Sequence, residues 1–151
     1  MASTKRPRIG SERGVALLET AFTIPLLLLV AVAIFEFGRA FETWQVMTNA
    51  AREGARVAVL PNPGSGAVDA RVREYLEVGA LENVDSVSVA IDRNVSIDIG
   101  GTTASASRVT VTYPFSFMVL NPVANLVVNG STLGHPLTLT TSALMRNESQ
   151  F

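Results

Sequence analysis

Residues 15–35 read VALLETAFTIPLLLLVAVAIF, and this stretch decides the architecture of the chain. It holds 21 residues, of which Glu19 is the only ionisable one. A helix of this length, rising about 1.5 Å per residue, covers roughly 30 Å, the thickness of the hydrocarbon core of a bilayer. We therefore expect a transmembrane helix over residues 15–35. A membrane-embedded acid is costly and usually faces a protein partner, so Glu19 is a candidate functional residue; the alternative is a charge that snorkels to the membrane edge.

The charges on the two sides of this stretch differ in sign. The first fourteen residues carry a net charge of +3, and the remainder of the chain carries −4. Because positive flanks stay in the cytoplasm, we expect residues 1–14 to be a cytoplasmic leader and everything after residue 40 to lie outside. The acidic exterior part argues against nucleic acid as a partner. The charged residues of the leader are Lys5, Arg6, Arg8 and Arg13, opposed by Glu12.

Helix-forming sequence continues past the apolar stretch and predicts an amphipathic extension over residues 36–60. Two prolines and two glycines then break the helix, so residues 61–67 are expected to form a linker. Beyond the linker, apolar residues recur at i, i+4, i+7 and i+8, which predicts a short amphipathic helix that ends near Gly79. The residues of this pattern are Val68, Val72, Tyr75 and Leu76.

The apolar period then changes from the helical one to two, which is typical of strands. Residues 87–91 and 95–99 alternate between apolar and polar, and we expect Arg93-Asn94 between them to form a hairpin connection. A third alternating run reaches Pro114, which should end the strand or place it on an edge. An irregular stretch and a last strand follow. The predicted fold class is α+β: a long N-terminal transmembrane helix, a short helix and a small antiparallel sheet, the last two in an extracytoplasmic domain over residues 68–151.

Small residues on the long helix predict close helix packing. Two pairs are four residues apart, Ala50 with Gly54 and Ala51 with Ala55, and such a surface lets another backbone approach closely. That backbone belongs either to the chain's own sheet or to another subunit. One face of the helix could pack on the sheet while a different face packs on another subunit. The proline in the membrane segment is either a harmless kink or a functional bend. The full set of candidates for helix packing is Pro25, Gly38, Ala50, Ala51, Gly54 and Ala55.

Charged residues three positions apart predict ion pairs on the same helix. Glu36 can pair with Arg39, and Glu53 can pair with Arg56. Such pairs contribute only a few tenths of a kcal/mol each, so they do not by themselves decide where the helix lies.

Gly14 and the five residues after it resemble a known processing site. A basic leader, then Gly14-Val15-Ala16-Leu17-Leu18-Glu19, is similar to the start of type IV prepilins and pseudopilins, in which a membrane aspartyl protease cuts after the glycine. Thr20 departs from that pattern, since the family usually has an aromatic residue there.

A second pattern covers the whole long helix and resembles TadE-like proteins, which are pseudopilin-like components of the Tad (tight adherence, Flp) pilus machinery. Two late segments are also similar to strands of that family. The segments that carry the resemblance are LETAF at 18–22, PLLLL at 25–29, EFGR at 36–39, NAAREGAR at 49–56, VTVTYPF at 109–115 and LTLT at 137–140.

The resemblance implies a minor pilin or pseudopilin of the Tad pilus. Cleavage between Gly14 and Val15 by a prepilin peptidase would create a charged amine on Val15, and Glu19 would attract that amine on a neighbouring subunit. The implied partners are other pilins, the Tad machinery of the inner membrane, the peptidase and the bilayer. The implied location is the bacterial inner membrane, with the N-terminus cytoplasmic and the C-terminal domain periplasmic, or the extracellular pilus.

Two alternatives stay open. A basic flank and an apolar segment also describe a signal peptide, and Ala31-Val32-Ala33 supplies small residues for cleavage, which would release a soluble binding module. Against cleavage, the helical pattern continues after Ala33 without a polar break. The second alternative is an unprocessed envelope scaffold that keeps residues 1–14.

The sequence predicts neither an enzyme nor a cofactor or metal site. His135, the only histidine, lies in a turn, and the chain has no cysteine, which excludes a disulfide framework or a thiolate zinc site. The aspartates show no calcium-loop spacing. They are Asp69, Asp85, Asp92 and Asp98.

Overall fold

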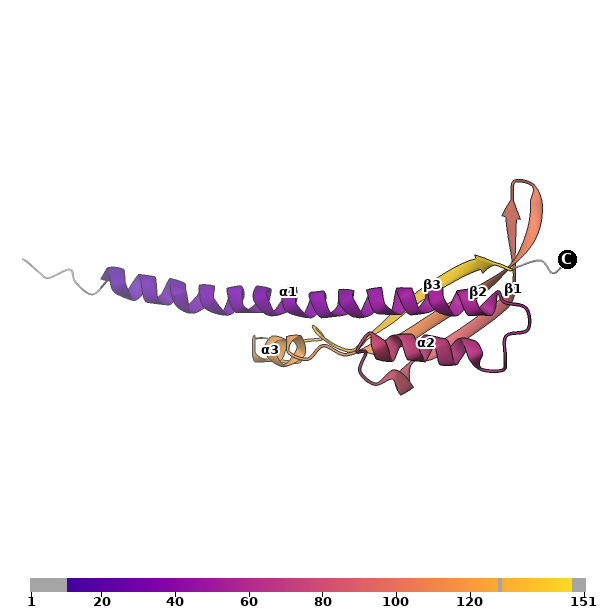
Figure 1. The fold of residues 1–151 in the computed structure, drawn as a ribbon. Helices are drawn as coiled ribbons and strands as arrows, with labels where there is room; N and C mark the ends of the chain where they lie inside the picture. The colour runs from indigo at the N-terminus through magenta and orange to yellow at the C-terminus, as the bar shows by residue number, and fades with distance from the viewer. Residues whose placement is uncertain (1–10, 128, 148–151) are drawn as a thin grey trace, which may run out of the picture.

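The computed structural model describes residues 11–127 and 129–147, and it shows a long helix with a small domain packed along its C-terminal half (Figure 1). The expected α+β class is confirmed, since the structure contains a three-stranded antiparallel sheet in addition to the helices. In chain order the elements are helix α1 (Ser11–Ala58), helix α2 (Ala67–Val78), the one-turn 3-10 helix η1 (Val84–Ser86), strands β1 (Ser88–Ile99) and β2 (Thr102–Phe115), helix α3 (Leu120–Val127) and strand β3 (Leu137–Arg146).

Helix α1 is continuous from before the expected cleavage site to the linker. Residues 1–10 of the expected leader lie outside the described residues, and α1 begins at Ser11. Pro25 lies inside the helix, which Figure 1 shows as a single unbroken rod. The helix is long and apolar enough to cross a membrane, and no part of its most apolar window is buried in the molecule. These apolar residues are therefore not part of the hydrophobic core of the domain.

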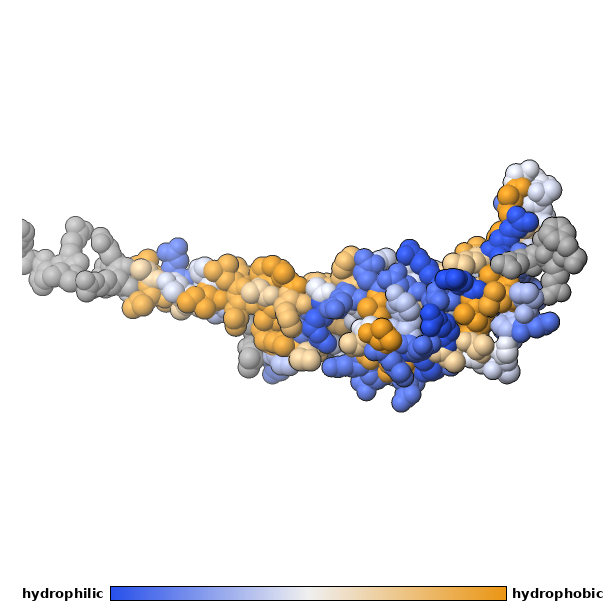
Figure 2. Space-filling model, in the orientation of Figure 1, coloured by the Kyte–Doolittle hydropathy of each residue, from blue (hydrophilic) through white to orange (hydrophobic). Residues whose placement is uncertain are grey.

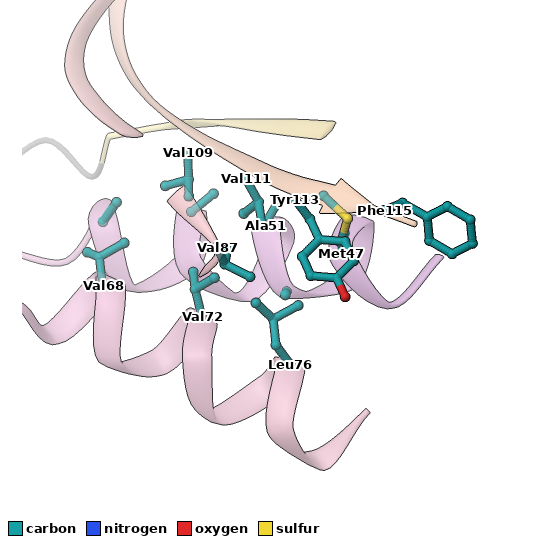
Figure 3. Packing of buried hydrophobic residues seen from close by; sticks show 13 residues of the cluster. Met47, Ala51, Val68, Val72, Leu76, Val87, Val109, Val111, Tyr113 and Phe115 are labelled. Atoms are coloured by element: carbon teal, nitrogen blue, oxygen red, sulfur yellow. The ribbon is translucent and has the colours of Figure 1, made fainter. Parts of the chain in front are cut away.

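The core of the domain forms where small residues of α1 let other elements approach. α1 contacts α2 on one side and β2 and β3 on another. Figure 3 shows the apolar side chains of these elements gathering beside α1. The buried residues of this cluster are Met47, Ala50, Ala51, Ala55 and Ala58 of α1, Val68, Val72 and Leu76 of α2, Val87 before β1, and Val109, Val111, Tyr113 and Phe115 of β2.

The sheet has the order β1-β2-β3, with β2 in the centre. Alternate residues of β2 face the helices, as the period of two predicts. Pro114 lies one residue before the end of this central strand. β1 has already stopped pairing there, since its last partnered residue is Ser88 opposite Thr112, whereas β3 still pairs with Pro114. The proline is thus on a locally open side of the strand, the position that strand prolines require.

The expected hairpin at Arg93-Asn94 is wrong. β1 runs through these residues, and the register shifts between Asp92 and Val95 as in a β-bulge. The chain turns instead at Gly100 and Gly101, whose φ angles are 61° and 90°. Two-residue hairpin loops favour positive φ at their central positions, and glycine adopts positive φ without steric cost. The chain therefore turns at this glycine pair and not at Arg93-Asn94.

Helix α3 lies within the stretch that the sequence left irregular. It follows β2 and leads back to β3 through residues 129–136. In Figure 1, α3 lies beside the middle of α1, displaced from the sheet towards the N-terminal half of that helix. It contacts α1.

Candidate functional site: the exposed half of the long helix

Residues 14–28 of α1 are exposed at every position. Figure 2 shows that hydrophobic residues cover the N-terminal part of α1, whereas hydrophilic residues gather over the domain. An apolar helix surface of this extent is not stable in water, so its environment is a bilayer or other subunits. The protein is membrane-anchored through this helix.

Glu19 interrupts this apolar surface with one carboxylate. Its side chain is exposed, and no ion pair between described residues includes it. Nearby hydroxyls are satisfied within the helix: the Oγ1 atoms of Thr20 and Thr23 donate to the carbonyls of Ala16 and Glu19, both at 2.8 Å. The Glu19 carboxylate is therefore exposed on the apolar surface, and a partner for it stays a prediction.

Gly14 and Val15 lie in the first turns of α1, three residues after its start at Ser11. Both are exposed, and a Cβ built on Gly14 would meet no atom within 4 Å. Packing does not require glycine here. A protease that cuts the peptide bond between Gly14 and Val15 needs the helix to unwind there. Glycine lowers the free energy of that unwinding by roughly 1 kcal/mol relative to alanine.

The small residues near the end of α1 are used by the chain's own domain. Ala50, Ala51 and Ala55 have no exposed surface. A Cβ built on Gly54 would lie 2.5 Å from Cγ2 of Val72, so only glycine fits between α1 and α2 without a shift. The close approach predicted for this face is thus made within the molecule.

The other two candidates for helix packing contact no part of the domain closely. Pro25 and Gly38 are both exposed. A Cβ on Gly38 would find open space. Contact at these positions with another subunit stays a prediction.

Both ion pairs that the sequence suggested have their charges within 4 Å, but only one is close. Arg39 Nη1 lies 2.9 Å from Glu36 Oε2. Arg56 Nη1 is 3.9 Å from Glu53 Oε2, while Glu53 Oε1 accepts from Arg71 Nη2 at 2.9 Å and from Arg71 Nε at 3.2 Å. Glu53 therefore links α1 mainly to α2, a partner that spacing along one helix cannot show.

Glu36 has a second role that the sequence did not indicate. It is fully buried at the end of the apolar stretch. Its Oε1 accepts hydrogen bonds from the backbone N–H groups of Val119 and Leu120, where α3 begins. Unpaired N–H groups at a helix start need an acceptor, and a carboxylate there also complements the helix dipole. Glu36 of α1 thus supplies the N-terminal cap of α3.

The electrostatics of this contact favour the charged carboxylate. Burial alone raises the pKa of Glu36, but the N–H groups of Val119 and Leu120 and the guanidinium of Arg39 together bring it below the ordinary value of 4.5. Glu36 is therefore ionised at neutral pH and holds α3 against α1.

A cleft between α1, the loop after α2 and the end of β2 offers little catalytic chemistry. Its volume is about 540 Å³, and Arg39, Glu42 and Tyr113 line it. The hydroxyl of Tyr113 already donates to the carbonyl of Glu82 at 3.0 Å. Within the part of the chain that the structure describes, no group of three or more His, Cys, Asp or Glu side chains could hold a metal.

One protein-family model matches most of the long helix. Residues 14–56 match the model of the family described as TadE-like protein, which confirms the resemblance drawn from the sequence over that segment. The match is a likeness of this helix to that family. Neither the curated proteins nor the solved structures contain a match to the chain.

Proposed function

We propose, from the TadE-like character of residues 14–56, that this chain is a minor pilin or pseudopilin that acts as a structural part in assembling Tad pili. The observation that carries the proposal is the exposed apolar N-terminal part of α1, residues 14–28, with Glu19 on its surface. The orientation is N-terminus in the cytoplasm and domain in the periplasm, because the leader carries the excess of basic residues. The inner-membrane machinery and other pilins are the partners.

Maturation is by prepilin peptidase between Gly14 and Val15. The new amine on Val15 and the carboxylate of Glu19 on a neighbouring subunit then have opposite charges in a low-dielectric environment. The attraction there is much stronger than in water, although desolvation of both groups offsets much of it. What the pair supplies is register between helices. The leader blocks it, because the nitrogen of Val15 is then part of a peptide bond.

The test replaces the carboxylate without changing its shape. Glu19→Gln should abolish co-purification with the other pilus subunits and reduce the number of pili. Glu42→Gln is the matched control, since Glu42 is exposed on the same helix beyond the membrane segment. Intact pilus assembly by the Glu19→Gln chain would contradict the proposed role of the carboxylate.

The intact mass of the native protein separates the proposal from its two alternatives. A chain beginning at Val15 supports peptidase processing, one beginning at Ile34 supports release by signal peptidase, and one that keeps residues 1–14 supports an unprocessed scaffold. The proposal is supported over release by the continuity of α1 through Ala33 and by the burial of Glu36 three residues later.

A further inference from the structure

The part of α1 that is clear of the domain is too short to cross a bilayer. Residues 14–28 are exposed without interruption, and 15 residues at about 1.5 Å each give roughly 22 Å. A hydrocarbon core is about 30 Å thick. The segment cannot be lengthened at its start, because Glu12 and Arg13 precede it. The span must therefore include residues 29–35, to which other parts of the chain come close.

Helix α3 is the element beside these residues. Leu29, Val32 and Ala33 are half-buried and Glu36 is buried, while the residues between them are exposed. Their spacing of i, i+3, i+4 and i+7 places them on one face of α1. α3 packs against α1, and Figure 1 shows it alongside this region rather than beside the sheet. When α1 spans the bilayer to residue 35, α3 lies at the depth of its outer half.

The composition of this region suits that depth. Residues 116–136 contain no Asp, Glu, Lys or Arg. Around α3, Met118 is 60% exposed and Leu133 is 59% exposed. Exposed apolar side chains in a charge-free segment are unfavourable in water and favourable in lipid.

Several polar groups of the segment bond to Glu36 or to one another. Glu36 accepts from the N–H groups at the start of α3. The amide of Asn121 donates to the carbonyl of Leu133 at 3.1 Å, and that of Asn125 donates to the carbonyl of Asn121 at 3.0 Å. Gly134 comes so close that a Cβ there would lie 2.5 Å from the nitrogen of Asn121. Internal bonds of this kind are what a chain needs to enter a low-dielectric layer.

We propose that residues 116–127 and 129–136, which include α3, insert into the outer half of the bilayer against α1 as a second membrane contact. The partner is lipid, because the surface is continuous with the transmembrane face of α1. The inference rests on the proposed function insofar as α1 must span the membrane. Glu36 then lies at the outer surface of the bilayer, directly after the membrane-spanning residues. Its negative charge is balanced by Arg39 and by the N–H groups at the start of α3.

The experiment uses the full chain in phospholipid vesicles. The sequence has no cysteine, so a single introduced cysteine carries a nitroxide spin label at one known place. Labels at Met118→Cys and Leu133→Cys report on the segment. Val30→Cys is the control for lipid, and Val78→Cys, 84% exposed at the end of α2, is the control for water. The readout is relaxation of each label by oxygen, which concentrates in lipid, and by a water-soluble nickel chelate.

Labels at 118 and 133 should resemble the label at 30, with high oxygen and low nickel accessibility. Nickel accessibility at 118 and 133 like that at 78, with position 30 in lipid, would overturn the inserted segment and leave the membrane anchor intact. Low accessibility to both reagents would place another protein there and would also overturn it. Nickel accessibility at position 30 would refute the transmembrane helix and the inserted segment together.

Discussion

Glu36 lies where the apolar half of α1 meets the domain, and its carboxylate joins three groups. The guanidinium of Arg39 is three residues away on the same helix, so the sequence alone could predict that pair. The N–H groups of Val119 and Leu120 come from a part of the chain more than eighty residues away. No local pattern reports such a distant contact, and the only signal in the sequence was an acidic residue at the end of an apolar run.

Removing the charge of Glu36 should loosen the domain. Glu36→Gln keeps the shape but weakens the cap of α3 and leaves Arg39 without its partner, so we expect the free energy of unfolding to fall by about 2 kcal/mol. The measurement is urea unfolding in detergent micelles, followed by the fluorescence of Trp44, the only tryptophan. Glu42→Gln should change little. Equal stability of the two variants would show that the cap is not stabilising.

The same carboxylate should make stability depend on pH. Its pKa is lower in the folded protein than the ordinary 4.5, because the bonds from Val119, Leu120 and Arg39 outweigh burial. The unfolded chain therefore binds the proton more readily. The stabilisation is complete above pH 4.5 and is lost as the pH falls through the folded pKa. Other carboxylates add their own dependence, so the test is the difference between wild type and Glu36→Gln, which should shrink on acidification below pH 4.5.

Two glycines of α1 should respond to alanine in opposite directions. Helix propensity alone favours alanine by about 1 kcal/mol. At Gly54 the new Cβ would meet Val72, which is fully buried and β-branched, so we expect Gly54→Ala to lose about 1–3 kcal/mol of stability. Gly38→Ala meets open space and should gain up to about 1 kcal/mol. If Gly38 packs against another subunit, this variant is more stable alone but assembles less well.

At the scale of elements, the strongest periodic signals were the ones that predicted correctly. The long apolar stretch became α1, and the i, i+4, i+8 pattern became the buried face of α2 through Val68, Val72 and Leu76. α3 was missed because its eight residues are too few for a clear pattern, and its place is set by Glu36. The hairpin was misplaced because alternation continues on both sides of Arg93-Asn94, and a bulge there interrupts the pattern without turning the chain.

The turn between β1 and β2 gives a direct test of that correction. Gly101 has a φ of 90°, which side chains rarely adopt. Gly101→Ala should therefore lower the free energy of unfolding by about 1–2 kcal/mol. Gly64→Ala, in the linker with no atom near its Cβ, is the control and should have little effect. If the turn were at Arg93-Asn94, the two alanine variants would behave alike.

At the scale of the whole molecule, the charge asymmetry predicts which side of the membrane the domain occupies. Ser65→Cys places a single thiol in the exposed linker of a chain that otherwise has none. We expect a membrane-impermeant maleimide to label it in intact spheroplasts, because the basic leader keeps the N-terminus inside. Labelling only after lysis would reverse the orientation. Val30→Cys should stay unlabelled in both conditions, since thiols in lipid react poorly with a water-soluble reagent.

Helix α1 enters the membrane segment and the domain core without a break, and its last turns are packed on both α2 and the sheet. No joint separates the two halves between Ser11 and Ala58, so a load along the axis at one end is transmitted to the other. Any shift of the domain along this axis would therefore carry the N-terminal end of α1 the same distance.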